Sequence, residues 1–345
     1  MLMPEATNCL EYDRMDLRFA VIGFGKMGIL HSGILNLLNP GCVRAVVDRS
    51  RLLVFGASRL IKSVRFYRKI DEMLNKEDPD VVYVTTPPEA HYGIVSRLLE
   101  ACVRYIFVEK PPTTNYEQLA SLMDRLGNNQ MVMTGFQKRF ALPFRHAKAL
   151  ISKDVIGDVQ EICAYVKSGD IKEPTRRFDA LGKGVLLDLG IHLVDLLLWM
   201  FNAKTVEASR CRRIYTGVDD FFEAKLRTDD GVTVNMEATW SSDEHRLPET
   251  YIEVHASNGA LRVTEDYLKV ETIERHPMLN GKKLVMYKPH YYQSVPPANL
   301  ADPEYTLEDV HFLYSIHSSM IPLTSLGNIA ETMELIDELY RKAGV

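Results

Sequence analysis

The sequence predicts an α/β protein of two domains, in which a parallel sheet covered by helices precedes a large open sheet that is mostly antiparallel. Three observations predict this architecture. The chain has 345 residues, more than one hydrophobic core usually organises. Strand and helix patterns alternate from residue 17 to about residue 135. From residue 159 to residue 273, strand patterns joined by short turns dominate instead.

The first half of the chain has the strand pattern of a sheet that is buried on both faces. Its apolar runs are continuous rather than alternating, as expected when helices cover both sides of a parallel sheet. The runs cover residues 17–22, 43–48, 81–85, 105–109 and 130–135. Helical patterns lie between them at 26–38, 52–60, 70–75, 91–103 and 116–127. We therefore expect a doubly wound parallel sheet.

The pattern changes after residue 140. Helical patterns cover 143–152 and 187–200, and strand patterns cover 159–167, 206–212, 221–228, 232–240, 251–256, 261–264 and 267–273. Asp229-Asp230-Gly231 and Ser257-Asn258-Gly259 supply hairpin turns, so we expect an α+β domain with one open sheet. Residues 277–303 are rich in Pro and Tyr and predict an irregular excursion, and helical patterns at 304–318 and 328–342 close the chain.

These changes of pattern set the expected domain boundaries. Residues 1–16 precede the folded pattern and are interpreted as an N-terminal extension. Residues 17–136 form the first domain and residues 137–345 the second. The last helix, at about 328–342, is expected to pack back on the first domain.

The composition argues against nucleic acid, membrane and metal as partners. The formal net charge is −5 at pH 7 and no basic patch stands out, whereas a nucleic-acid surface needs one. The longest apolar stretch, 185–201, contains Asp188, His192 and Asp195, which a membrane span would not tolerate. The 5 cysteines form no CxxC pair and the histidines are scattered, which favours reduced thiols in the cytoplasm and no metal site. The first residues show no signal peptide.

A glycine loop between the first strand and the first helix predicts a dinucleotide site. Gly23, Gly25 and Gly28 give the pattern GxGxxG in the context that such a site requires, after a strand and opening a helix. The helix N-terminus would offer N–H groups to the pyrophosphate. The residues expected at the cofactor in this loop are Gly23, Phe24, Gly25, Lys26, Met27 and Gly28.

Asp48 and Arg49, at the end of the second expected strand, bear on whether NAD or NADP binds. Asp48 ends that strand, where a carboxylate accepts hydrogen bonds from ribose hydroxyls and repels a 2′-phosphate. This favours NAD and a Rossmann domain. Arg49 leaves NADP open, because its guanidinium would hold a 2′-phosphate if the carboxylate turned away.

With its glycine loop, Asp48 and several later motifs, the chain resembles the glucose–fructose oxidoreductase, inositol dehydrogenase and rhizopine-catabolism family (Gfo/Idh/MocA). The resemblance spans about residues 17–343. It is carried by GFGKMG at 23–28, Asp48, Thr86-Pro87-Pro88 with His91, Glu109-Lys110-Pro111, GFQKRF at 135–140, and GVLLDLGIHLVD at 184–195. The order and spacing of these motifs are more specific than any one of them.

The resemblance implies a nicotinamide held in the cleft between a Rossmann domain and an open-sheet domain. Members of the family mostly oxidise a secondary hydroxyl of a sugar, cyclitol or sugar derivative, or run the reverse reduction. Lys110, Asp188 and His192 would form a catalytic trio, and the Lys110–Pro111 bond is expected to be cis. Copies of the chain are expected to assemble as a homodimer or homotetramer through the free face of the second sheet.

The residue types fit this chemistry. Removing a hydride from a secondary alcohol also requires a base for the proton, and His192 suits that role near neutral pH. A protonated Lys110 would polarise the oxygen. Asp188 lies four residues before His192, so on a helix it would share a face with the imidazole and either orient it or bind a substrate hydroxyl. Asp195, three residues after His192, is a candidate partner of the imidazole.

Further residues are expected near the cofactor or the substrate. The expected cofactor contacts outside the glycine loop are Asp48, Arg49, Thr86, Pro87, Pro88, His91, Glu109 and Lys110. The candidate substrate contacts are Arg139, Tyr165, Arg176 and Trp240, with Lys138, Arg177, His245, Tyr291 and Tyr292 as weaker candidates. For each substrate candidate, surface charge or packing on the sheet is the alternative.

Three functions remain open at this point. The leading hypothesis is an NAD-dependent dehydrogenase acting on a small-molecule polyol or sugar. A second is a reductase of the same fold that prefers NADPH and a ketosugar or dicarbonyl substrate. A third, from another class, is a cofactor-binding sensor or scaffold without turnover.

Overall fold

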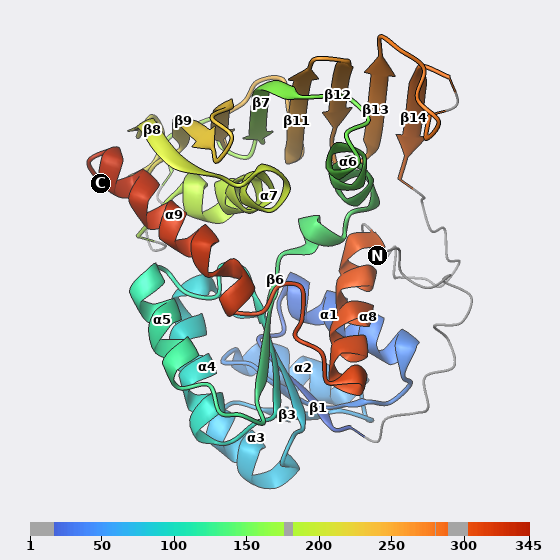
Figure 1. Cartoon of the computed structure of the whole chain (residues 1–345). Helices are drawn as coiled ribbons and strands as arrows, with labels where there is room; N and C mark the ends of the chain where they lie inside the picture. Colours follow the sequence, from blue (N-terminus) through green and yellow to red (C-terminus); the bar gives the residue numbers. More distant parts are fainter. Residues whose placement is uncertain (1–16, 176–181, 280, 289–302) are drawn as a thin grey trace.

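A computed structural model shows two sheets, the first covered by helices on both faces and the second on one face (Figure 1). The structure describes residues 17–175, 182–279, 281–288 and 303–345. The N-terminal sheet is parallel and has six strands, and the second sheet is mostly antiparallel and has eight. The predicted fold class is thereby confirmed.

The first sheet has the order β3-β2-β1-β4-β5-β6, and all of its neighbouring strands pair in parallel. Its strands, in spatial order, are β3 (Arg65–Tyr67), β2 (Val43–Val47), β1 (Phe19–Ile22), β4 (Val81–Val84), β5 (Tyr105–Glu109) and β6 (Met131–Gly135). The strand order reverses between β1 and β4, and this switch point is where sheets of this kind bind ligands, at the carboxyl ends of the strands.

Helices cover both faces of this sheet. In β4, Val82 and Val84 belong to one hydrophobic cluster, whereas Val81 and Tyr83 belong to the other. The helices that follow these strands are α1 (Lys26–Leu38), α2 (Arg51–Leu60), α3 (Ile70–Glu77), α4 (His91–Glu100) and α5 (Tyr116–Asp124). Helix α8 (Pro303–Ser318) comes after the second sheet in the chain, yet it packs beside α1 on the first sheet through Phe312. The chain therefore returns to the first layer.

The second sheet pairs its strands antiparallel except between β7 and β10, which are parallel. Its strands, in spatial order, are β14 (Lys283–Tyr287), β13 (Tyr267–Thr272), β12 (Gly259–Val263), β11 (Glu249–Ala256), β7 (Val159–Lys167), β10 (Thr233–Thr239), β9 (Phe221–Thr228) and β8 (Ala203–Arg212). Because β7 and β10 are central and parallel, their carboxyl ends meet at the same edge of the sheet.

Three helices pack on one face of the second sheet, between it and the first domain (Figure 1). These are α6 (Leu142–Ser152), α7 (Ile191–Phe201) and α9 (Ala330–Lys342). Helix α9 contacts α5 as well as α7 and β8, so it touches both layers of the molecule. In the described part of the chain, no helix combines the length and apolar character that crossing a membrane requires.

The structure differs from the expected elements in three places. Strand β3 was not expected, because three residues at a sheet edge give too short a pattern. Strand β14 lies in the segment expected to be irregular, and its alternation of exposed and half-buried residues reflects an edge position. The single helix expected over 187–200 begins instead with a π-helical turn, Leu186–Gly190, before α7 starts at Ile191.

A buried ion pair joins three elements of the second layer. Arg139, in the 3₁₀ turn Gln137–Phe140, donates to both carboxylate oxygens of Asp195 on α7, at 2.8 and 2.7 Å. Thr332 on α9 donates to the same carboxylate at 2.9 Å. The expectation that Arg139 contacts a substrate is therefore wrong, because its guanidinium is consumed by this pair. The expectation that Asp195 partners His192 is wrong for the same reason.

We predict that Asp195→Ala lowers the free energy of unfolding by about 3–5 kcal/mol, because it leaves the Arg139 cation buried without its partner. The side chains of this pair are only 6% and 1% exposed. Asp243→Ala is the matched control, since the Lys172–Asp243 pair is exposed and such pairs contribute little. Urea denaturation of both variants measures the difference. Equal, small effects of the two substitutions would show that the Arg139–Asp195 pair does not support the fold.

Candidate active site

The glycine loop after β1 is shaped by close contacts of its backbone. Gly23 has φ +94°, and a Cβ there would lie 2.8 Å from the carbonyl oxygen of Thr85. A Cβ on Gly28 would lie 2.0 Å from the carbonyl oxygen of Gly23. Gly25 has nothing within 4 Å of a Cβ position. Two of the glycines are thus required for packing, and the third leaves space for a ligand to approach the backbone.

The N-terminus of α1 has the features of a phosphate site. Gly25 caps the helix without a side-chain hydrogen bond, and the first turn carries no acidic residue. Its N–H groups are therefore available to an anion. Close by, the hydroxyl of Thr86 follows β4 and is buried with no hydrogen-bond partner among the described residues. An open glycine, uncapped amides and an unpaired hydroxyl together fit a dinucleotide.

Asp48 lies beside this loop, as expected. Its carboxylate accepts the backbone N–H of Phe24 at 2.8 Å and that of Ser50 at 2.8 Å. It therefore holds the glycine loop against the end of β2, and each oxygen keeps a further lone pair for a ribose hydroxyl. Arg49 is exposed next to it.

Two residues expected at the cofactor have buried side chains. His91 is 0% exposed, and its ring nitrogens lie 2.7 Å from the carbonyl oxygens of Thr86 and Pro111. Burial lowers the pKa of His91. Glu109 is 7% exposed, and its carboxylate lies against His31 and the backbone N–H of Lys110. Both side chains are therefore used to fix the backbone of this region, and contact of these two residues with the cofactor stays a prediction.

Lys110 reaches from the end of β5 to the second domain. The Lys110–Pro111 peptide bond is cis, as the resemblance implies. The ammonium of Lys110 donates to the carbonyl oxygen of Asp188 at 2.7 Å and to its carboxylate at 3.1 Å. The two side chains are 19% and 35% exposed, so the pair borders open space. The structure therefore brings together two of the three expected catalytic residues.

Hydrogen bonds to Asp219 fix the π-helical turn that carries Asp188. The Asp219 carboxylate accepts the N–H groups of Gly184 and Leu186 at 2.8 and 3.0 Å. Tyr340 on α9 donates to the same carboxylate and accepts from the N–H of Leu187. A Cβ on Gly184 would lie 1.9 Å from the carbonyl oxygen of Asp219, so only glycine fits at the start of the turn. This turn places the Asp188 carboxylate toward Lys110.

His192 lies one turn further, at the start of α7. It is 5% exposed, its ring packs edge-on against Phe136 at 6.0 Å, and its Nδ1 has no hydrogen-bond partner among the described residues. Burial, with the positive charges of Lys110 and Lys138, lowers the pKa of His192 well below its usual 6.5. The imidazole is therefore neutral at neutral pH and able to accept a proton. Asp188 does not orient it, since its carboxylate turns to Lys110.

Lys138, which was only a weak candidate in the sequence, is a further charged group of this site. It forms an ion pair with Glu265, whose carboxylate also accepts the N–H of Thr250. Residues 138 and 265 are far apart in the sequence, so no local pattern predicts the pair. The positive charge of Lys138 contributes, after burial and Lys110, to the lowered pKa of His192.

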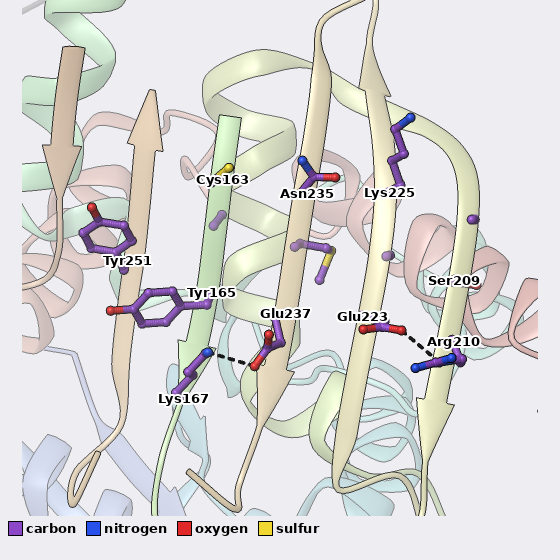
Figure 2. A pocket seen from close by; sticks show the side chains of 14 residues that line it. Cys163, Tyr165, Lys167, Ser209, Arg210, Glu223, Lys225, Asn235, Glu237 and Tyr251 are labelled. Carbon is purple, nitrogen blue, oxygen red and sulfur yellow. Dashed lines mark ion pairs between the residues drawn. The ribbon is translucent and has the colours of Figure 1, made fainter. Parts of the chain in front are cut away.

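Two other expected substrate contacts lie away from this site. Tyr165 is on the face of the second sheet opposite to α7, where it stacks on Tyr251 and donates to Glu249 at 2.7 Å (Figure 2). Trp240 is 1% exposed within the hydrophobic core. The expectations for both are wrong, because residue type does not reveal which face a strand residue occupies. Arg176, with Arg177, Tyr291 and Tyr292, lies outside the described residues.

Within the residues that the structure describes, no group of three or more His, Cys, Asp or Glu side chains has the arrangement of a metal site. The chemistry available here is that of a lysine paired with Asp188 at the carboxyl end of a parallel sheet, together with a neutral histidine on the helix that follows Asp188. Such a lysine and histidine can polarise an oxygen and accept its proton.

Comparisons with known proteins agree with this geometry. Residues 17–136 match the model of the "Oxidoreductase family, NAD-binding Rossmann fold", and residues 144–262 match that of the "GFO/IDH/MocA C-terminal domain". Among curated relatives, a trans-1,2-dihydrobenzene-1,2-diol dehydrogenase of Xenopus tropicalis is 25% identical over 81% of this chain and 83% of that protein. An inositol 2-dehydrogenase of Rhizobium meliloti is 24% identical over 72% of this chain and 75% of that protein.

Solved structures share the fold. An oxidoreductase from Agrobacterium radiobacter, in complex with NAD+, L-tartaric acid and magnesium, superposes with a TM-score of 0.81 at 18% identity, over 96% of this chain and 97% of that one. A levoglucosan dehydrogenase in complex with NADH and levoglucosan gives 0.80 at 18% identity, over 95% and 97%. With both of its domains matched by the family models, the chain belongs to the Gfo/Idh/MocA family of oxidoreductases and binds NAD through its Rossmann domain.

Proposed function

We propose that this protein oxidises a secondary hydroxyl of a sugar, cyclitol or sugar derivative with NAD, or runs the reverse reduction. The observation that carries the proposal is the contact of Lys110 with Asp188, whose turn leads directly into the helix that carries the neutral His192. Its relatives include dehydrogenases of inositol and of a cyclic diol, which are hydroxyl-bearing rings. Bound NAD would supply the hydride acceptor.

The residues of the chain divide the remaining work between them. Lys110 donates a hydrogen bond from its ammonium to the substrate oxygen and stabilises the negative charge that develops there. His192 accepts the hydroxyl proton, for which its neutral state prepares it. Asp188 holds the Lys110 ammonium at the cleft and has a carboxylate that is 35% exposed, from which it can bind a neighbouring hydroxyl. A polyol offers such a neighbouring hydroxyl.

A second candidate function is a reductase that prefers NADPH, and Arg49 is the observation that favours it. Its guanidinium is exposed next to Asp48, where the 2′-position of the adenosine ribose is expected. A sensor or scaffold without turnover is the third candidate. The convergence of Lys110, Asp188 and His192 argues against it, since binding alone does not require these three groups.

We also propose that copies of the chain assemble through the free face of the second sheet. That face carries the half-buried Tyr165 and Tyr251 among ion pairs such as Lys167–Glu237 (Figure 2). Aromatic rings framed by charged pairs suit contact with a second copy.

We predict that Lys110→Met abolishes NAD reduction with a responsive polyol and leaves the dissociation constant for NAD within about threefold of that of the wild-type protein. Methionine keeps the aliphatic stem but removes the proton donor to the reacting oxygen. A panel of cyclitols, aldoses and sugar derivatives identifies the substrate by NADH absorbance. Lys153→Met, at an exposed position on the far end of α6, is the control. Turnover by the Lys110 variant at the wild-type rate would remove Lys110 from the mechanism.

The pH dependence of oxidation tests His192. We predict an acidic limb of kcat/KM below the reference pKa of about 6.5, because the lowered pKa keeps His192 neutral until the pH falls well under that value. Lys138→Gln removes one of the positive charges that lower this pKa, so the limb should move to higher pH. Lys153→Gln should leave the limb in place. A limb that does not respond to Lys138→Gln would show that another group is the base.

The cofactor preference follows from the Asp48 carboxylate. We predict that NAD binds at least tenfold more tightly than NADP, because Asp48 repels the 2′-phosphate. Quenching of protein fluorescence during titration with each cofactor measures both dissociation constants. Arg49→Ala distinguishes the candidates, since it should weaken NADP binding alone. Tighter binding of NADP by the wild-type protein would favour the reductase instead.

A further inference from the structure

A buried chain of charged groups runs from α8 to the backbone of Lys110. His31 on α1 is 0% exposed and lies between two carboxylates. Its Nδ1 is 3.0 Å from both oxygens of Asp309 on α8, and its Nε2 is 3.0 Å from one oxygen of Glu109 at the end of β5. The other oxygen of Glu109 accepts the backbone N–H of Lys110 at 3.1 Å. Four groups on three elements are thus connected in series.

The position of His31 between two carboxyl groups favours the imidazolium form, which donates from both ring nitrogens. A neutral imidazole donates from one nitrogen only, so its second nitrogen would turn a lone pair toward a carboxylate oxygen. Burial opposes protonation, but Asp309 and Glu109 outweigh it and raise the pKa of His31 well above 6.5. Burial raises the pKa of Asp309, and the adjacent His31 opposes that rise. The titratable groups that surround the ring are Tyr83 on β4, Glu109 on β5, and Tyr305, Glu308 and Asp309 on α8.

The nearby Glu308 takes no part in this series of hydrogen-bonded groups. It is 0% exposed, and neither of its carboxylate oxygens has a hydrogen-bond partner among the described residues. Burial, and then the nearby Glu109, raise the pKa of Glu308 well above its usual range, so this carboxyl is neutral. The hydrogen bonds of the His31 ring therefore go to Asp309 and Glu109, and Glu308 offers a neutral position in the same cluster for comparison.

The Glu109 carboxylate has little freedom to find other partners. It is 7% exposed, and Gly135 on β6 packs against it so closely that a Cβ there would lie 3.0 Å from its Oε2. Its two oxygens are divided between His31 and the N–H of Lys110. Without the Nε2 donor, a buried carboxylate would lose its charge-assisted hydrogen bond and the position that this bond sets.

We propose that His31, anchored by Asp309, is a positioning residue that acts through Glu109 to hold Lys110 in place. The effect of His31 on turnover rests on the proposed catalytic role of Lys110. Its effect on the position of the Lys110 side chain does not. This positioning role gives a function to a histidine in the middle of the dinucleotide-binding helix. Lys110 is then fixed at both ends, by Glu109 at its backbone and by Asp188 at its ammonium.

Two uncharged substitutions separate the two hydrogen bonds of His31. In His31→Gln, the side-chain amide nitrogen falls near the former Nε2 and can still donate to Glu109. In His31→Asn, the amide nitrogen falls near the former Nδ1 and can donate only to Asp309. Both variants lose the same charge, so a difference between them reports the Glu109 hydrogen bond. Glu308→Gln is the control within the cluster, and thermal melting checks that each variant folds.

The first readout is the reactivity of the Lys110 amine in the NAD-bound protein. Acetic anhydride labels lysines, and mass spectrometry gives the rate at Lys110 relative to the exposed Lys153. We expect His31→Asn to raise the relative rate at Lys110 at least threefold, because the ammonium leaves Asp188 more often. His31→Gln and Glu308→Gln should stay within about 1.5-fold of the wild-type rate. Equal rates for the Asn and Gln variants at position 31 would overturn the proposal.

The second readout is turnover with the polyol identified above. We expect His31→Asn to lower kcat by about 10–100-fold, as small misplacements of a catalytic group do, and to change the KM for NAD less than threefold. His31→Gln should retain more than a third of kcat. An unchanged kcat in His31→Asn would overturn the positioning role. If the wild-type protein oxidises no polyol, the proposed function fails, and the labelling contrast alone decides whether His31 holds Lys110.

Discussion

The contact between Lys110 and Asp188 is the interaction on which the site depends. It joins the end of β5 in the first sheet to the π-helical turn that precedes α7. The two residues are 78 positions apart in the sequence. Each partner has its own support, Glu109 for the lysine backbone and Asp219 for the turn. The site is thus built where two separately braced segments meet, and α9 and α8 return from the end of the chain to pack on both layers.

The environments of the ionisable groups differ in the way that acid–base chemistry requires. Lys110 and Lys138 are each paired with a carboxylate, that of Asp188 and that of Glu265 respectively. His192 has no such partner among the described residues and is almost fully buried, so the same two cations keep it neutral. Lysines paired with carboxylates and a neutral imidazole that feels their charge therefore belong to one site, which is the pattern expected when groups take opposite roles in proton transfer.

Much of the fold and the centre of the site could be predicted from local sequence. Gly23, Gly25 and Gly28 follow a strand and open a helix, and the motifs around Lys110 and His192 have a recognisable order. What could not be predicted depends on contacts between distant positions. Lys138 meets Glu265 across 127 positions, and His31 meets Asp309 across 278. The expectation that Arg139, Tyr165 and Trp240 contact the substrate is wrong, because the type of a residue does not show whether it is buried or which face of a sheet it occupies.

A crystal structure with NADH and an unreactive analogue of the identified polyol would test the central claim most directly. We expect one hydroxyl oxygen of the analogue to lie within hydrogen-bond distance of both the Lys110 ammonium and the His192 imidazole, with a second hydroxyl at Asp188. The carbon that bears the first oxygen should face C4 of the nicotinamide. An analogue bound elsewhere, or an oxygen that reaches neither Lys110 nor His192, would contradict the assignment of this cleft as the active site.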